Sequence, residues 1–252
     1  MLQVSHLNKS YSNSVTVYPV LKDVSLHIKR GEFVAVMGPS GSGKTTLLNC
    51  ISCFIPHDSG SICLGGQELS GLSSDGQLAR IRNEKLGFVF QDFMLLDGLS
   101  VMENICLPQI IAGKPIAQME SNAQKLCQLF GISKIMNKYP AEISGGEKQR
   151  TAVARSLMNH PLMILADEPT GNLDSKSCKA VIAAFLQAKA QLHAAIFMVT
   201  HDSYAASFCD RVLVLKDGKI WTEAAGSGSQ RQFMDELLDI LRTLGGDGSD
   251  NA

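Results

Sequence analysis

Residues Gly38–Thr45 read GPSGSGKT, and this stretch decides the fold of the chain. It fits the pattern G-x-x-x-x-G-K-[ST] and follows a continuous apolar run, Phe33–Met37, which is typical of a strand buried on both faces. Lys44–Ile51 then has the pattern of a helix. In that context the glycines turn backbone N–H groups toward phosphate oxygens at the positive end of a helix dipole. The stretch is therefore predicted to be a phosphate-binding loop rather than a glycine-rich turn that fits by chance.

This loop supplies most of the predicted nucleotide contacts. Lys44 is expected to reach the β- and γ-phosphates of ATP and to take part in catalysis, and Thr45 to offer its hydroxyl to Mg²⁺. The predicted nucleotide-binding residues of this stretch are Gly38, Pro39, Ser40, Gly41, Ser42, Gly43, Lys44, Thr45 and Thr46.

The rest of the chain alternates buried strands with helices. Short apolar runs at Leu162–Ala166, Ala195–Val199 and Val212–Leu215 predict further buried strands, and helical patterns such as Cys178–Lys189 separate them. This order is typical of an α/β fold with a mostly parallel core sheet. Val20–Ile28 alternates apolar and polar side chains, which indicates a half-exposed strand.

A helical insertion interrupts this pattern. Between Gln91 and Ser144 there is no buried-strand run, and the composition favours helix. We expect one nucleotide-binding domain over residues 1–225, with a helical subdomain at about residues 92–158 inserted in its core. Residues 226–252 are expected to form a short helix and a disordered tail that ends in GGDGSDNA. The helix is predicted from the spacing of Phe233, Leu237, Leu241 and Leu244.

Two adjacent carboxylates follow a later buried strand. Asp167 lies at the carboxyl end of that strand, where open α/β sheets place their ligands, and is expected to hold Mg²⁺ directly or through water. Glu168 comes next, and an adjacent carboxylate is suited to act as the base that activates water. With a phosphate loop in the same chain, the pair predicts ATP hydrolysis rather than a solvated surface.

A second glycine motif lies at Ile143–Arg150, which reads ISGGEKQR. Ser144, Gly145 and Gly146 open a helix whose exposed N–H groups are suited to bind another phosphate. One γ-phosphate cannot be enclosed both by the first loop and by a helix end so distant in the same fold. We therefore expect the second motif to act on the nucleotide of a second copy of the chain.

Together these motifs resemble the ATP-binding-cassette (ABC) family, whose signature is LSGGQ. The resemblance covers about residues 1–222 with every motif in order. It implies that Tyr11 stacks on adenine, that Gln91 at a strand end senses Mg²⁺ and the attacking water, and that His201 contacts the γ-phosphate. It also implies that Gly171–Asp174, GNLD, links two copies in a head-to-tail dimer that encloses ATP.

The resemblance adds detail to the fold and to the metal site. It implies a P-loop nucleoside-triphosphatase fold, in which an antiparallel β subdomain accompanies the mostly parallel core sheet and the helical insertion. The predicted catalytic residues are then Lys44, Gln91, Glu168 and His201, and the predicted Mg²⁺ ligands are Thr45, Gln91 and Asp167.

The signature departs from the family pattern at two positions. Ile143 replaces leucine, which is conservative packing. Glu147 replaces glutamine, which suits the helix dipole but brings a carboxylate toward phosphate. Because the family includes branches with glutamate here, Ser144, Gly145, Gly146 and Glu147 are all predicted to contact nucleotide.

Composition and charge narrow the class of protein. The formal net charge of −1 gives no support for nucleic-acid binding. No apolar run approaches the ~20 residues that a spanning helix needs, and the N-terminus does not read as a signal peptide. We expect the chain to work at the cytoplasmic face of the cell membrane with a separate multi-spanning permease. The seven scattered cysteines are expected to be reduced structural thiols.

Longer stretches indicate a branch of the family. EPTGNLDSKS, from residue 168, is similar to lipoprotein-releasing, macrolide-efflux and cell-division ATPases. VTHDSYAASFCDRV, from residue 199, is most similar to ATPases of bacitracin-type antimicrobial-peptide resistance transporters. Two alternatives stay open. The first is a cassette protein without a transporter, which usually has two cassettes or a long coiled-coil insertion, whereas this chain has one cassette and no such insertion. The second is an ATP sensor without turnover, which would be expected to lose the base, whereas Glu168 and His201 are both present.

An apolar cluster follows Gln91 and is too apolar for a solvated loop. The cluster either packs into a small core of the insertion or lines a groove that takes a short helix of the permease, as the resemblance implies. ATP-driven closure would then act on the permease through Gln91 and this groove. The members of the cluster are Phe93, Met94, Leu95, Leu96 and Leu99.

Overall fold

The computed structural model describes residues 1–13, 15–72, 74–226 and 228–246. The chain divides into two compact units. The first contains residues 1–28, 33–70 and 198–252, and the second contains residues 29–32 and 71–197.

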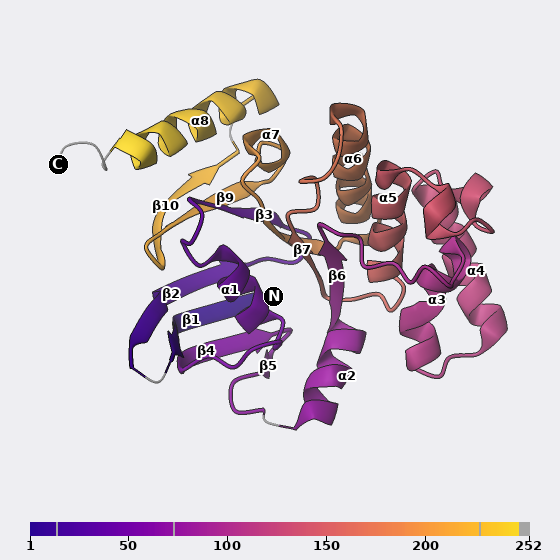
Figure 1. Ribbon diagram of the computed structural model, residues 1–252, viewed down its shortest axis with the longest axis horizontal. Coiled ribbons are helices and arrows are strands. Elements are labelled where there is room, and N and C mark those ends of the chain that lie inside the picture. Colours follow the sequence, from indigo (N-terminus) through magenta and orange to yellow (C-terminus); the bar gives the residue numbers. More distant parts are fainter. Residues whose placement is uncertain (14, 73, 227, 247–252) are drawn as a thin grey trace. The chain divides into compact units, whose positions relative to one another are not determined.

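Antiparallel strands form one sheet of the first unit (Figure 1). Its central strand β1 (Leu2–Ser12) pairs with β2 (Val17–Ile28) on one side and with β4 (Ser59–Leu64) on the other. The short strand β5 (Gln67–Glu68) continues the sheet beyond β4. This is the predicted antiparallel subdomain, and that part of the fold prediction is confirmed.

The strand that leads into the phosphate loop belongs to a second sheet, only part of which lies in this unit. β3 (Phe33–Met37) is buried along its whole length and pairs in parallel with β9 (Arg211–Lys216), which pairs antiparallel with β10 (Lys219–Ala225). Burial on both faces explains why β3 is a continuous apolar run. The helices of this unit are α1 (Lys44–Ile51), α7 (Ser203–Ala206) and α8 (Gln230–Gly246).

The second unit combines parallel strands with most of the helices. β6 (Leu86–Phe90) and β7 (Met163–Asp167) pair in parallel, with Phe90 opposite Asp167 at their carboxyl ends. The chain passes from the second unit to the first within β8 (Ala195–Val199). The helices are α2 (Asp75–Lys85), α3 (Val101–Ile111), α4 (Ile116–Leu129), α5 (Gly145–Ser156) and α6 (Ser175–Leu192), with 3₁₀ turns at Ser133–Ile135 and Pro140–Glu142.

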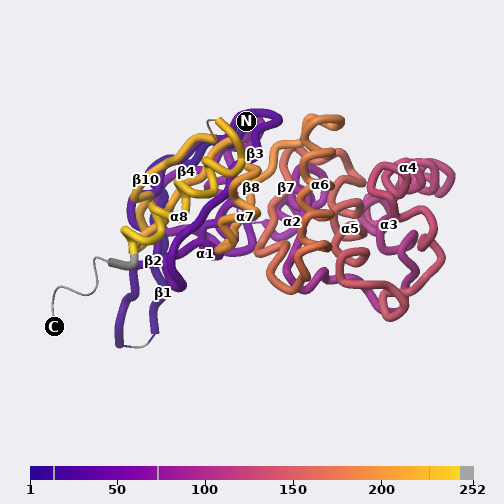
Figure 2. Tube along the Cα trace, turned by 90° about the horizontal axis from the view of Figure 1, so that it is seen from above, coloured from indigo at the N-terminus to yellow at the C-terminus, as the bar shows by residue number. Residues whose placement is uncertain are grey.

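Helix α5 occupies the middle of the helical layer in this unit. Figure 2 shows it between α6 on one side and α3 and α4 on the other. The predicted insertion at about residues 92–158 lies inside this unit, which also contains β6, β7 and α6. Any change in the position of α5 must therefore be felt by helices on both of its sides.

The described helices include none that is long and apolar enough to cross a membrane. All seven cysteines are free thiols in this structure, and burial raises the pKa of Cys50 to about 12, so it stays protonated at neutral pH. Helix α8 buries Phe233, Leu237 and Leu244 of the four apolar positions from which it was predicted. Of the predicted tail, residues 247–252 lie outside the described part of the chain.

Candidate nucleotide-binding and catalytic site

The phosphate loop has a backbone that only glycine adopts without strain at its first position. Gly38 has φ 148°, and a Cβ there would lie 2.1 Å from the carbonyl oxygen of Leu215. Lys44 folds back over the loop, and its Nζ donates to the carbonyl oxygens of Gly38 and Pro39, both at 2.9 Å. The lysine therefore lies on the loop itself, where phosphate oxygens would replace these carbonyl groups as acceptors.

Helix α1 begins without a side-chain cap. Its N-cap is Gly43, with φ 105°, and no side chain accepts a hydrogen bond there. The first-turn N–H groups of such a helix are unsatisfied within the helix and attract anions. Ser42 Oγ, on a residue only 4% exposed, also has no partner among the described residues. A phosphate group would satisfy both kinds of donor.

The other predicted contacts of the first unit are exposed. Tyr11 is near the end of β1, opposite Tyr18, with its side chain 44% exposed. Lys9 Nζ lies 5.5 Å from the centroid of the Tyr11 ring. His201 is exposed two residues beyond β8 and next to Asp202, which caps α7. Both predicted residues are thus accessible to a ligand.

In the second unit, the two carboxylates lie at a sharp change of chain direction. Asp167 is the last residue of β7, and Glu168 has the left-handed φ of 47°. The turn is closed by a hydrogen bond from Gly171 N–H to the carbonyl oxygen of Glu168, at 3.0 Å. A non-glycine residue in this region of φ/ψ space costs ~1–3 kcal/mol and is characteristic of functional sites.

Strand β6 places Gln91 at its carboxyl end, beside the carboxyl end of β7. Because Phe90 is opposite Asp167, Gln91 and Glu168 each follow the last paired residue of their strand. Gln91 Nε2 donates to Asn172 Oδ1 at 3.0 Å, and Asn172 Nδ2 donates to Asp92 Oδ1 at 3.1 Å. The glutamine uses its nitrogen in this bond, so the amide oxygen is the atom it can offer to a cation.

The signature serine and Glu147 form a capping box at the start of α5. The carboxylate of Glu147 accepts from the backbone N–H of Ser144 at 2.9 Å and from its hydroxyl at 2.8 Å. These bonds, the backbone one first, lower the pKa of Glu147 below its ordinary value. The carboxylate that replaces the family's glutamine is therefore turned back toward Ser144.

The predicted residues fall into two groups within the units. The first unit holds Tyr11, the phosphate loop and His201, and the second holds Gln91, Asp167, Glu168 and Ser144–Glu147. Sequence reasoning gave no role of their own to three further side chains around the second group, although two of them lie in the quoted motifs ISGGEKQR and GNLD: Gln149, Arg155 and Asn172. Their roles depend on tertiary contacts that no short motif signals. The capping box, by contrast, is readable as S-x-x-E.

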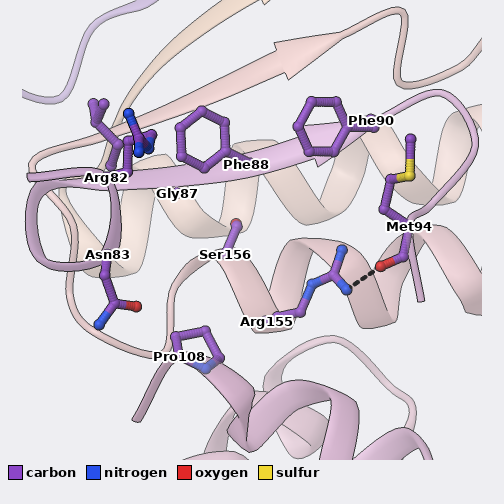
Figure 3. A pocket seen from close by; sticks show the side chains of 10 residues that line it. Arg82, Asn83, Gly87, Phe88, Phe90, Met94, Pro108, Arg155 and Ser156 are labelled. Carbon is purple, nitrogen blue, oxygen red and sulfur yellow. Dashed lines mark hydrogen bonds between the residues drawn. The ribbon is translucent and has the colours of Figure 1, made fainter. Parts of the chain in front are cut away.

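Arg155 holds the backbone that follows Gln91. From α5, its guanidinium donates to the carbonyl oxygens of Phe93, at 2.7 Å, and of Met94 (Figure 3). Phe93 and Met94 both have left-handed φ values, 61° and 48°. Burial lowers the pKa of Arg155 to about 10, so it stays cationic at neutral pH. These bonds fix the strained turn to α5, the helix that begins with the signature motif (the signature helix).

A groove of about 290 Å³ lies beside this turn (Figure 3). Phe88 and Phe90 stack along it with ring centroids 5.9 Å apart. Met94 lines it with a side chain that is 57% exposed. No member of the apolar cluster is fully buried: three are half-buried, and Met94 and Leu96 are exposed. The lining residues are Arg82, Asn83, Leu86, Gly87, Phe88, Phe90, Met94, Pro108, Arg155 and Ser156.

Comparison with known proteins gives consistent matches. A family model described as ABC transporter matches residues 21–171. The chain is 45% identical to the ABC transporter ATP-binding protein YxdL of Bacillus subtilis, over 99% of this chain and 96% of that protein. It is 42% identical to the bacitracin export ATP-binding protein BceA of Halalkalibacterium halodurans, over 98% of this chain and 97% of that protein.

A solved structure is also similar to this chain. The dimeric post-hydrolysis state of the ATP-binding cassette MJ0796, bound to ADP and Pi, aligns with a TM-score of 0.81 at 36% identity. The alignment covers 91% of this chain and 100% of that chain.

Proposed function

The chain belongs to the ABC transporter family and is the ATP-binding, ATP-hydrolysing subunit of such a transporter. On this basis we propose a role for each residue of the site. Gly38–Thr46 holds the phosphates, with Lys44 on the β- and γ-phosphates. Tyr11 stacks on adenine. The uncapped start of α1 and the left-handed Gly38 support this role for the loop.

Mg²⁺ fits the ligands proposed for it. The hydroxyl of Thr45, the amide oxygen of Gln91 and the carboxylate of Asp167 are hard oxygen donors of the kind this ion prefers. When bound, the ion neutralises negative charge on the phosphate oxygens. Only one of these three ligands is a carboxylate. The site therefore differs from a cluster of three or more His, Cys, Asp or Glu side chains, which the described residues do not include.

Glu168 acts as the base in the proposed mechanism. It takes a proton from the water that attacks the γ-phosphate, while Gln91 orients that water and His201 contacts the γ-phosphate. The register of β6 and β7 is the main support for this proposal. Because Phe90 pairs with Asp167, Gln91 and Glu168 both directly follow the carboxyl ends of neighbouring strands.

Replacing the base tests the mechanism. Glu168→Gln keeps size and hydrogen bonding but removes proton acceptance, so ATP should still bind while hydrolysis falls by roughly 10²–10⁴-fold. Two subunits should then stay closed over unhydrolysed ATP, which gel filtration with ATP would show as a stable dimer. Near-normal phosphate release by this variant would place the base elsewhere.

A second copy of the chain completes each site. Ser144–Gly146 of one copy contacts the γ-phosphate held by the loop of the other, and the GNLD loop links the two copies head to tail. The exposed Ser144 at the start of α5 supports this arrangement. Activity of the isolated subunit should then rise more than linearly with its concentration, and strictly linear activity would indicate a self-sufficient monomer.

A multi-spanning permease docks at the groove beside Met94, on the cytoplasmic face of the cell membrane. The half-exposed apolar cluster and the aromatic lining of the groove support this proposal. Phe93→Asn, Met94→Asn and Leu95→Asn should keep ATP binding by the isolated subunit and weaken capture by the permease. Ile116→Asn, an exposed isoleucine at the start of α4, is the matched control. Cluster variants that unfold would favour the core interpretation, and folded variants with full capture would place the groove elsewhere.

Within the family, the branch we propose is antimicrobial-peptide resistance. The match to the bacitracin export ATP-binding protein spans nearly the whole of both chains and supports this choice. Deleting the gene together with its permease should sensitise cells to peptide antibiotics. Unchanged sensitivity with altered lipoprotein release or macrolide export would favour those sister branches.

A further inference from the structure

One buried glutamine contacts the backbone beside both proposed catalytic residues of the second unit. Gln149, on α5, is 0% exposed. Its Nε2 donates to the carbonyl oxygen of Phe90 at 3.2 Å and to that of Pro169 at 2.8 Å. Phe90 directly precedes Gln91, and Pro169 directly follows Glu168.

The two carbonyl groups lie where the sheet stops pairing. The last register pair between β6 and β7 is Phe90 with Asp167, and the chain then leaves the strand through the left-handed Glu168. Buried backbone carbonyl groups beyond a ladder need donors from elsewhere. A single side-chain amide provides both, and so it joins the two strand ends where the backbone ladder has ended.

The other end of this amide indicates that the glutamine is there for its donors. Among the described residues, nothing hydrogen-bonds to the buried Oε1 of Gln149. A buried acceptor left in this state costs ~1–3 kcal/mol, which an apolar side chain of similar length would avoid. The stabilising contribution of Gln149 therefore comes from the two bonds that its nitrogen makes.

An exposed contact runs parallel to this buried one. Gln91 and Asp92 both bond to the side chain of Asn172, three residues beyond Pro169. The segments 90–92 and 169–172 are thus joined at two places, by Gln149 in the interior and by Asn172 at the surface. The Gln149 joint is the stiffer one because its bonds are buried or partly buried, and solvent competes less for them than for the exposed bonds of Asn172.

We propose that Gln149 is a positioning residue for ATP hydrolysis, which sets the spacing of Gln91 and Glu168 and links both to the signature helix. The inference rests on the proposed roles of those two residues. Ser144 opens the same helix five residues earlier. A shift of α5 caused by the nucleotide of the partner copy would therefore reach both catalytic loops through one side chain, and each ATP site would report its occupancy to the other.

Gln149→Met tests the proposal, with Gln109→Met as the matched control. Gln109 is also a buried helical glutamine of this unit, but it donates its Nε2 to the carbonyl oxygen of Met158, at 2.7 Å. Both variants should lose similar thermal stability. Only Gln149→Met should lose kcat, by about tenfold or more, with KM for ATP within about twofold, because misplaced groups slow the chemical step. Equal kcat in the two variants would overturn the proposal.

Hydrogen exchange separates this proposal from the catalytic one. In nucleotide-free protein, amides of residues 90–94, 168 and 170–173 should exchange faster in Gln149→Met than in Gln109→Met, whatever the identity of the base. Unchanged exchange would overturn the positioning role, whereas only Glu168→Gln bears on the base. If Gln149→Met does not fold, Gln149→Asn keeps a buried amide one methylene too short for both carbonyl groups. It should lose kcat in the same way, and full kcat would count against the proposal.

Discussion

Two helix starts in this chain carry glycine motifs, and their glycines serve different purposes. In the phosphate loop, Gly38 and Gly43 have left-handed φ values, which other residues rarely adopt. In the signature, Gly145 and Gly146 begin α5 and make room for neighbours. A Cβ on Gly146 would lie 2.7 Å from Ser177 Oγ on α6. Gly38 needs glycine both for its backbone conformation and for the close approach of Leu215, whereas Gly146 has no left-handed φ and needs glycine only for its lack of a side chain.

The two helix starts also differ in how their polar groups are satisfied. The start of α1 has no side-chain cap, whereas Ser144 and Glu147 cap α5 reciprocally. An uncapped start is prepared for an anion at any time. A capped start offers fewer free donors and retains its exposed serine. We infer that the first loop binds ATP alone and that the signature acts only when a partner brings ATP to it.

Among the tests of this comparison, the largest effect should follow from Gly38→Ala. The new Cβ would meet backbone, the carbonyl oxygen of Leu215 at 2.1 Å, and the φ of 148° is strained for alanine. Because the loop must shift, ATP affinity should fall by about 10²-fold or more. Fluorescent-nucleotide titration would measure this loss, with circular dichroism to confirm folding. Normal affinity would show that the left-handed backbone is not what binds phosphate, and the contrast between the motifs would disappear.

Complementation between subunits sharpens the comparison next. Lys44→Ala disables the first loop and Ser144→Arg disables the signature, so each homodimer should be inactive. In an equal mixture half of the dimers are mixed, and each keeps one intact composite site, so activity should recover to about a quarter of wild type if the sites work independently. Phosphate release would be measured, with each variant alone as control. No recovery would indicate that both motifs serve one chain or that a single site cannot turn over.

The parts of the fold that were predicted from sequence are those with unbroken patterns. Phe33–Met37 and Ala195–Val199 have their predicted bounds because both are continuous buried runs. Strand β1 was not identified, because register shifts between Val4 and Leu7 interrupt its alternation and His6 is left-handed there. Helix α2 buries only Ile81, so it has little periodicity to detect.

The site shows the same division between local and tertiary information. Ser144 and Glu147 are three residues apart, so their capping box is a local signal in the sequence. Gln149 bonds to residues 59 and 20 positions away, and Asn172 to one 81 positions away. Contacts of that range are set by the pairing of β6 with β7, which residue type and spacing alone do not reveal.

A moderate effect should follow from Gly146→Ala, and its relief would identify steric packing as the cause. The new Cβ would lie 2.7 Å from Oγ and 2.9 Å from Cβ of Ser177, so the variant should lose ~1–3 kcal/mol of unfolding free energy. Ser177→Gly removes both atoms, although it also removes a bond to Asp174. The double variant should therefore be more stable than the sum of the single effects predicts, as measured by urea unfolding. Strict additivity would mean that contact with Ser177 is not the reason for glycine at position 146.

The smallest effect should come from Glu147, and it separates capping from repulsion of phosphate. If the carboxylate serves the cap, Glu147→Gln should keep turnover near wild type and lose less than ~1 kcal/mol of stability, and Glu147→Ala should lose about 1 kcal/mol. The lowered pKa fixes the pH dependence. A carboxylate whose folded pKa is below its unfolded value of about 4.3 contributes stability that is fully present above that value and is lost as pH falls through the folded pKa.

Urea unfolding of wild type and Glu147→Gln should therefore differ by a constant amount between pH 7 and pH 5.5, and the difference should shrink below about pH 4.3, where the carboxyl group becomes protonated and resembles the amide. Glu147→Ala should stay less stable than both at neutral pH, because it provides no acceptor for the N–H and hydroxyl of Ser144. A marked rise in ATP turnover in Glu147→Gln would give the opposite answer. It would mean that the Glu147 charge faces the phosphate of the nucleotide bound by the partner copy and opposes its binding. The electrostatics of its helix start, rather than its cap, would then decide how the second motif acts on ATP, as they do for the first motif.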